Sequence, residues 1–360
     1  MRIPCRFLLA LLVFCCLPVV GTGHAQSIGL VATLALHDGP DRERILMEGA
    51  KKEGGLTLYT SIAQKDLPPL ITAFEKKYGI KVQVWRAGSD KVLQRTLTET
   101  SGKRFEVDAV HIGAPELEAL HLEKVLQSVS SPAFNSLLPG AVPAHREWVA
   151  TRLTVFVQAY NTNLIKKEDL PKTWQELTDP KWKGKLGVEF TDDEWFHSLV
   201  QQLGEERGLR LFRDIVANNG VSVRKGHTLL TNLVASGEVP LALTVYNYMA
   251  EALKKRSAPI DWFVLQPAIT RANGVGIARQ APHPHAALLF YDYMLSVEAQ
   301  KMLVSMDYIP THAGVESPMK NLNLKVTHQT MTLSESEKWA RLYQEIISAP
   351  LEVNVKSKGK

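Results

Sequence analysis

Residues 55–85 read GLTLYTSIAQKDLPPLITAFEKKYGIKVQVW. The run Leu56–Thr60 is rich in residues that favour strands, and Asp66–Tyr78 places apolar side chains at helical spacing before Gly79. Lys81–Trp85 then alternates between polar and apolar residues, as a half-buried strand does. A strand, a helix and a second strand in this order predict an α/β sheet with parallel pairing.

The same alternation extends in both directions from this segment. Upstream, Asp41–Lys52 has helical spacing and is followed by two glycines. Downstream, Asp90 is expected to cap a helix that ends near Gly102. Val107–Ile112 predicts a buried strand, and Pro115 suits the first turn of the next helix.

Beyond residue 147 strands and helices alternate again. The expected strands are 148–160, 185–190, 221–224, 239–246, 260–265 and 275–278. The expected helices are 195–216, divided near Gly204 and Gly208, 228–235, 247–255 and 282–303. The strands near 148–160 and 260–278 are expected to join two lobes.

The first 25 residues show the three-part pattern of an export signal. Arg2 and Arg6 give a positive start, Phe7–Val20 is a nearly continuous apolar run, and Ala25 ends a stretch of small residues. The apolar run is too short for an ordinary membrane span. We therefore expect a signal peptide over residues 1–25, cleavage near Ala25, and a mature protein in the periplasm.

Removal of this segment changes the composition. All three cysteines lie within it, so the mature chain has no disulfide, no thiolate metal site and no cysteine nucleophile. Two of the 42 basic residues also lie within it, against 37 acidic residues in the chain, which leaves a net charge of +3. This weak charge, without a basic stripe, predicts no nucleic-acid partner.

The remaining length predicts two lobes, because 335 residues exceed what one hydrophobic core usually supports. Lobe 1 is expected to comprise residues 26–147 and 270–315, and lobe 2 residues 148–269. Residues 316–360 are expected to form a C-terminal helical segment and a basic tail.

Several short motifs of the sequence resemble segments of one protein family. The most specific is DPKWKGK at residues 179–185, supported by FEKKYGIKV at 74–82, VDAV at 107–110 and SGEV at 236–239. Together they resemble the bacterial extracellular solute-binding proteins of ABC importers, of the ferric-ion-binding type. The likeness covers roughly residues 50–315.

This resemblance implies an α/β, two-lobe periplasmic-binding-protein fold, the Venus flytrap, with a ligand cleft between the lobes. It also implies a binding protein that delivers a small-molecule solute to the membrane subunits of an ABC permease. We expect a monomer with no cofactor and no catalytic residues.

The iron ligands of the family match poorly. Its ferric members use two neighbouring tyrosines where this chain has YNYM at residues 246–249, and Ala63–Gln64 and Gly113 stand in place of a histidine and a glutamate. Because Fe(III) favours anionic oxygen ligands, we expect a small polar organic solute and no metal. Tyr246 is expected to point away from Tyr248. The ferric alternative would use Tyr246, Tyr248, Asp192 and Asp193.

Ligands in open α/β sheets lie beyond the carboxyl ends of strands, facing helix N-termini. This rule selects the candidate ligand contacts Thr60, Ser61, Ser89, Arg95, Asp192, Asp193, Trp195, Arg224, Tyr246, Asn247 and Tyr248. Capping is the alternative role for their hydroxyl and carboxyl groups. Arg95 and the segment Arg224–His227 would suit an anion, whereas Asp192, Asp193 and the ring of Trp195 would suit a cation.

Two other functions are compatible with an exported chain. A secreted hydrolase would need a catalytic motif, but the sequence contains no G-x-S-x-G, H-E-x-x-H, G-x-G-x-x-G or phosphate-loop pattern. A ligand sensor that docks on a signalling receptor would share the fold and the cleft.

Overall fold

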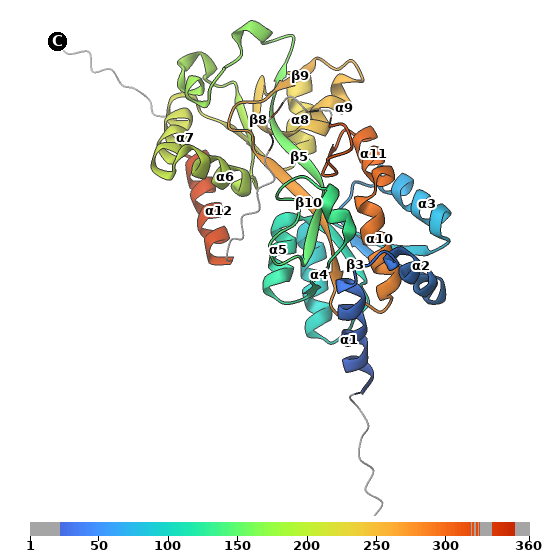
Figure 1. Ribbon diagram of the computed structural model, residues 1–360. Coiled ribbons are helices and arrows are strands. Elements are labelled where there is room, and N and C mark those ends of the chain that lie inside the picture. Colours follow the sequence, from blue (N-terminus) through green and yellow to red (C-terminus); the bar gives the residue numbers. More distant parts are fainter. Residues whose placement is uncertain (1–21, 318, 320–321, 323, 325–332, 350–360) are drawn as a thin grey trace, which may run out of the picture.

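A computed structural model describes residues 22–317, 319, 322, 324 and 333–349 of the chain. Its strands form one mixed sheet that runs through both halves of the molecule (Figure 1). In order across the sheet they are β2 (Lys81–Arg86), β1 (Gly55–Thr60), β3 (Ala109–Gly113), β10 (Thr270–Ala278), β5 (Trp148–Asn161), β8 (Leu241–Tyr246), β6 (Leu186–Glu189) and β7 (Ser222–Arg224). At the sides, β4 (Leu126–Gln127) pairs with β10, while β9 (Ile260–Phe263) and β11 (Ile309–Pro310) pair with β5.

Helices cover the sheet in both halves. On the N-terminal side they are α1 (Thr22–Leu36), α2 (Arg42–Glu53), α3 (Leu67–Tyr78), α4 (Ser89–Ser101) and α5 (Ala114–Leu122). Further along they are α6 (Asp193–Leu203), α7 (Glu205–Asn219), α8 (His227–Ser236), α9 (Asn247–Lys254), α10 (Pro284–Leu295), α11 (Val297–Ser305) and α12 (Leu333–Ile347). Short 3-10 helices lie at Pro132–Ser136, Lys167–Asp169, Trp174–Thr178 and Pro180–Trp182.

The strand, helix and strand predicted for residues 55–85 are confirmed. β1 pairs in parallel with β2 and with β3. α3 buries Leu67, Leu70 and Phe74, which share one face at helical spacing. The helix ends at Gly79, whose φ of 73° lets its N–H bond the carbonyl of Glu75.

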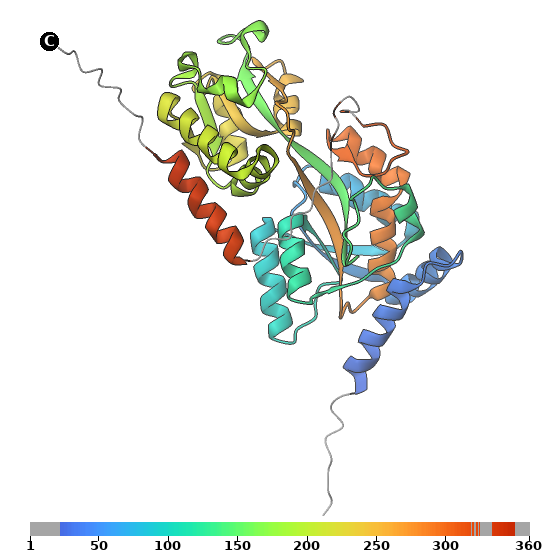
Figure 2. The same ribbon diagram turned by 60° about the vertical axis from the view of Figure 1, so that its left-hand side comes forward.

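Two long strands connect the halves of the molecule. β5 pairs with β10 and β11 along its first part and with β8 and β9 along its second part, always antiparallel. All 14 of its residues are buried. Figure 2 shows β5 and β10 side by side as they run from one half into the other.

Buried apolar side chains form two cores. One surrounds β1, β3, β5 and β10, includes most of α10, and continues along β5 to α8 and β8 of the second half. The other lies in the opposite half and contains Trp174, Trp195 and Phe212, together with Trp339 and Tyr343 of α12. This arrangement is the expected α/β fold with two lobes, and α12 packs on α6 of the second lobe. The exact lobe boundaries stay predictions.

Some local expectations were wrong. Gly88, not Asp90, caps α4, and Asp90 lies in the first turn. The expected helix 282–303 is interrupted at Ser296, whose hydroxyl caps α11 by accepting the N–H of Ala299. Residues 195–216 divide at Gly204 alone, since Gly208 lies inside α7. The sheet is mixed rather than parallel, because β5 and β10 run against their neighbours.

The predicted signal peptide falls mostly on residues 1–21, which lie outside the described residues, as does the basic tail at 350–360. The expected cleavage site near Ala25 falls within α1. Among the helices of the described part of the chain, none has the length and apolar character needed to span a bilayer.

The second core gives a testable prediction. Trp195 is 1% exposed and packs against Trp174 and Phe212, at ring-centroid distances of 5.7 and 5.6 Å. Trp195→Ala should lower the free energy of unfolding by about 3–5 kcal/mol, since it leaves a cavity among these rings. Urea unfolding followed by circular dichroism measures this loss. Leu122→Ala, at an exposed site on α5, should cost less than about 0.5 kcal/mol; equal losses would contradict the assignment.

Candidate functional site

A cavity of about 680 Å³ opens between the two halves of the molecule. Its lining comes from both lobes, from the crossing strands and from α12. The lining residues are Ser61, Gly88, Ser89, Asp90, Pro115, Glu116, Arg152, Thr154, Thr191, Asp193, Glu194, His227, Tyr246, Tyr248, Arg271, Asn273 and Ser336. Ser61, Glu116 and Tyr246 lie at or just beyond the carboxyl ends of β1, β3 and β8, as the general rule for open α/β sheets requires.

Two serines form the wall of lobe 1. The hydroxyl of Ser89, at the start of α4, donates to the hydroxyl of Ser61 at 3.0 Å and accepts the N–H of Gly113 at 3.2 Å. These contacts bring the loop after β1 and the N-termini of α4 and α5 together. Hydroxyl groups and helix N-termini are suited to an anionic or polar ligand.

Arg152 of β5 lies in the floor of the cavity and is 5% exposed. Its Nη2 donates to Oδ1 of Asn273 at 2.9 Å, and its guanidinium lies 3.9 Å from the ring centroid of Tyr308. Within the described residues no carboxylate lies at ion-pair distance from it. A buried cation in such surroundings is incompletely neutralised.

Arg271 of β10 connects the two lobes. Its Nη2 lies 3.4 Å from the carboxylate of Glu116 on α5, and its Nε lies 3.5 Å from that of Glu194 on α6. Its Nη1 donates to the hydroxyl of Tyr246 at 3.3 Å. Burial raises the pKa of Glu194 to about 7, against the lowering effect of Arg271.

Tyr246 and Tyr248 both face the cavity, and their rings stack at 5.9 Å with an angle of 12° between planes. The expectation that Tyr246 points elsewhere was therefore wrong. Tyr246 caps α9 and Tyr248 lies in its first turn, so strand alternation does not apply across this junction. Burial raises the pKa of both hydroxyls.

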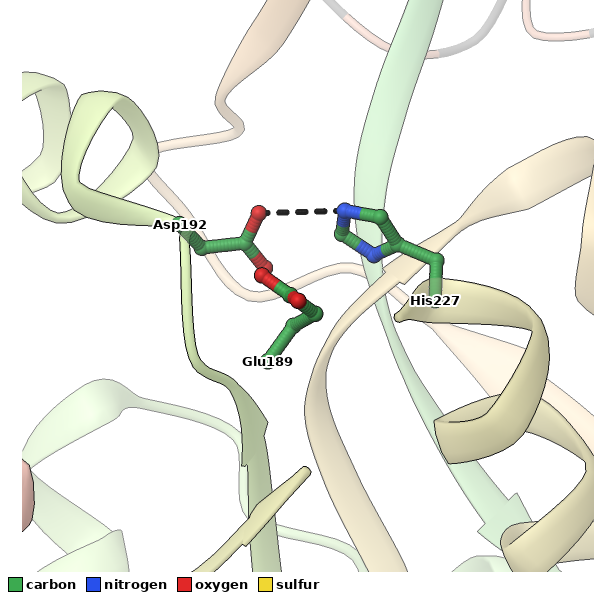
Figure 3. A group of neighbouring side chains, drawn as sticks. All are labelled: Glu189, Asp192 and His227. Carbon is green, nitrogen blue, oxygen red and sulfur yellow. Dashed lines mark ion pairs between the residues drawn. The ribbon is translucent and has the colours of Figure 1, made fainter. Parts of the chain in front are cut away.

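The His227 ring packs against the Tyr246 ring, at 3.9 Å between centroids and an angle of 33° between planes. Its Nε2 lies 3.1 Å from Oδ1 of Asp192 (Figure 3). Its Nδ1 lies 3.3 Å from the carbonyl oxygen of Thr244. Both nitrogens thus face acceptors, which favours the imidazolium. Burial lowers the pKa of His227, but the carboxylates of Asp192 and Glu189 outweigh it, and the net shift is upward.

Glu189, Asp192 and His227 form a cluster whose ligand atoms all lie within 4.8 Å of one another, so they could hold a metal ion (Figure 3). Hydrogen bonds already occupy Glu189: it accepts from the N–H and hydroxyl of Thr191 and from the N–H of Gly226. Oδ1 of Asp192 pairs with His227, whereas its buried Oδ2 has no hydrogen-bond partner within the described residues. The observed contacts therefore support a positioning role for this cluster, of which His227 lines the cavity.

The structure places Ser61, Ser89, Asp193, Tyr246 and Tyr248 at the cavity, among the residues that the sequence selected. Their contact with a ligand stays a prediction.

The other selected residues do not line the cavity. Thr60 is fully buried and its hydroxyl accepts the N–H of Ile62, while Asp192 is engaged with His227. Asn247 is buried, accepting the N–H of Val155 and donating to the carbonyl of Asp307.

Three large side chains, Trp195, Arg95 and Arg224, were also expected to contact a ligand but do not line the cavity. Trp195 lies in the core of lobe 2 and offers no ring face to a ligand. Arg95 lies over the rings of Tyr59 and Trp85 and pairs with Glu99, and Arg224 pairs with Glu238.

Sequence reasoning missed Arg152, Arg271, Asn273, Glu116 and Glu194 as cavity residues. Arg152 and Arg271 each interrupt an otherwise buried strand, which is a signal that could have been used. Glu116 and Arg271 fill the space beside Gly113, so that a Cβ atom there would lie 2.6 and 2.9 Å from their side chains.

A cavity lined by two α/β lobes and by the strands that join them defines a two-lobe binding protein. Residues 69–325 match the model of the family of bacterial extracellular solute-binding proteins, and the chain belongs to that family. The family predicted from the sequence, and with it the function as the substrate-binding component of an ABC importer, is confirmed.

Named relatives are distant in sequence and similar in length. Iron uptake protein A1 of Synechocystis sp. is 25% identical over 313 residues, 82% of this chain and 86% of that protein. The major ferric iron-binding protein of Neisseria meningitidis is 24% identical over 323 residues, 81% of this chain and 92% of that protein. The crystal structure of iron-bound HitA from Pseudomonas aeruginosa has a TM-score of 0.70 at 23% identity, covering 81% of this chain and 99% of that one.

Glu194 gives a prediction on pH. The ordinary pKa of its carboxyl is 4.5, and burial raises this pKa to about 7 in the folded state, so the folded state binds the proton more tightly. Its contribution to stability is therefore greatest below pH 4.5 and is lost as the pH rises to 7, by on the order of 3 kcal/mol. In Glu194→Gln the loss of unfolding free energy between pH 4.5 and 7.5 should be smaller by this amount.

Urea unfolding at the two pH values measures the difference. Glu206→Gln, at an exposed site on α7, is the control and should leave the pH dependence unchanged. A Glu194→Gln variant with the pH dependence of the parent protein would contradict the assignment.

Proposed function

We propose that this protein captures a small organic anion in the periplasm and delivers it to the membrane subunits of an ABC permease. Arg152 is the observation that carries the proposal. It is buried in the cavity floor, and no carboxylate lies at ion-pair distance within the described part of the chain. A buried charge without a counter-ion costs several kcal/mol, and a bound anion would supply the missing charge.

Other groups support the same ligand class. Thr154 and Asn273 flank Arg152 in the cavity floor, and Ser61 and Ser89 face it from lobe 1. The helix α4 directs its N-terminal turn at the same space. The sequence predicted a small polar solute, and we now specify that it is an anion. Ser61, Ser89 and Tyr248 are among its proposed contacts.

The remaining sequence predictions belong to this proposal. Lobe 1 comprises residues 26–147 and 270–315, lobe 2 residues 148–269, and the solute is enclosed when the lobes close about β5 and β10. The protein leaves the cytoplasm with a signal that is cleaved near Ala25. It acts as a monomer and catalyses no reaction.

Arg152→Gln tests the proposal. Charge-assisted hydrogen bonds contribute about 1.5–3 kcal/mol, so the variant should bind the anion about 10- to 100-fold more weakly. A thermal-shift screen of carboxylates, sugar phosphates and phosphonates identifies the anions that bind, and calorimetric titration measures their affinity. Arg210→Gln, an exposed arginine on α7, is the matched control. Equal affinities for Arg152→Gln and the parent protein, or a screen without any bound anion, would refute the proposal.

Ferric ion is a second candidate, favoured by the stacked pair of Tyr246 and Tyr248. Phenolates are hard oxygen ligands, and Glu116 and Glu194 line the same cavity. The names of the relatives from Synechocystis and Neisseria point to the same cargo.

We expect no ferric tyrosinate complex. Arg152 and Arg271 place two cations beside the tyrosine pair, and burial raises the pKa of both hydroxyls. Chelator-stripped protein mixed with ferric citrate should therefore show no intense visible charge-transfer band. A strong band that disappears in Tyr248→Phe and persists in Tyr160→Phe, a buried tyrosine of the second core, would establish ferric ion as the cargo.

A further inference from the structure

Above a pH of about 7, where Glu194 is ionised, the carboxylates that line the cavity outnumber its arginines. Asp90, Glu116, Asp193 and Glu194 all line it, and Arg271 is the arginine that contacts two of these groups. Its distances to Glu116 and Glu194, 3.4 and 3.5 Å, exceed the roughly 2.7–2.9 Å usual for charge-assisted hydrogen bonds. One guanidinium is therefore shared loosely between two carboxylates.

The other two acids have still less compensation. Within the described residues, Asp90 and Asp193 form no hydrogen bond or ion pair with another side chain. Burial raises the pKa of Asp193, and the nearby carboxylate of Asp192 adds to this shift. Such a group is stabilised in its charged form by any cation that enters the cavity.

Arg152 lies apart from Arg271 on the neighbouring strand, where it is paired with Asn273. It bonds Asn273, which is two residues along β10 from Arg271, a distance of about 7 Å on a strand. The cavity therefore offers a cation without a counter-ion at one end and a surplus of carboxylates a short molecule's length away. An anion bound at Arg152 alone would leave that surplus in place.

We propose that the solute is a zwitterion, whose anionic group binds Arg152 and whose ammonium group contacts the carboxylates of Glu116 and Glu194, which Arg271 pairs with only at 3.4 and 3.5 Å. This inference rests on the proposed function and specifies its solute class. Glu116 comes from α5 of lobe 1 and Glu194 from α6 of lobe 2. The ammonium group would thus contact both lobes and favour the closed state.

Matched pairs of probes test the inference. The zwitterions are β-alanine, 4-aminobutanoate and 2-aminoethylphosphonate, and their partners without the amine are propanoate, butanoate and ethylphosphonate. Calorimetric titration at pH 8, where the carboxyl of Glu194 with its pKa of about 7 is ionised, gives the ratio of affinities within each pair for the full mature protein. At least one zwitterion should bind tenfold or more tightly than its partner.

Substitutions test which residues produce the difference in affinity within a pair. Glu194→Gln and Glu116→Gln should bring the ratio of affinities towards one, whereas Arg152→Gln should weaken both members of a pair and leave the ratio unchanged. Glu206→Gln, on the exposed face of α7, should change nothing. Circular dichroism and the melting temperature establish that each variant is folded.

Two results would overturn the inference, and they are distinguishable. If no zwitterion exceeds its partner while anions still bind in an Arg152-dependent manner, the ammonium site is wrong and the proposed function stands. If Arg152→Gln changes no affinity, the proposed function fails and this inference fails with it. Tighter binding of both members of a pair to Glu194→Gln would show that the carboxylate merely repels the anion.

Discussion

The antiparallel pairing of β5 with β10 is the constraint on which the rest of the structure depends. These strands cross from one lobe to the other. β10 pairs on its other side with β3 of lobe 1, and β5 continues to pair with β8 of lobe 2. The same pairing places Arg152 beside Asn273 and Arg271 in the cavity floor. The connection between the lobes and the charged part of the binding site are therefore one piece of sheet.

Charge burial in this sheet has a cost that the local contacts offset only in part. The ring of Tyr308 and the amide of Asn273 compensate Arg152, and Arg271 is compensated by carboxylates from both lobes. A ligand-free cavity of this kind is electrostatically incomplete, and a ligand of complementary charge distribution gains affinity from completing it. The stability of the free protein and its affinity for the solute are thus linked through the same residues.

The aromatic wall formed by Tyr246 and Tyr248, which Arg271 contacts through the Tyr246 hydroxyl, is held by a buried polar network. Asp192 orients His227, the His227 ring packs at a tilt of 33° on Tyr246, and Tyr246 stacks on Tyr248. Hydrogen bonds to Glu189 fix the loop that carries Asp192. A stack supported in this way has little freedom to rearrange, so the shape of the wall is largely set before a ligand enters.

The sequence by itself determined the elements and the family. Apolar periodicity and Gly79 specify α3 and its end, and the motif at 179–185 points to the family that the comparison confirms. Only the tertiary structure decided the site. In the sequence Arg152 is only a charged residue within an apolar strand, and it is the register of β5 on β10 that places it beside Asn273. Trp195 follows a loop that faces the cleft, but its side chain packs into the core of lobe 2. Periodicity records which face of one element is apolar, whereas this cavity is defined by the register between strands that lie far apart in the sequence.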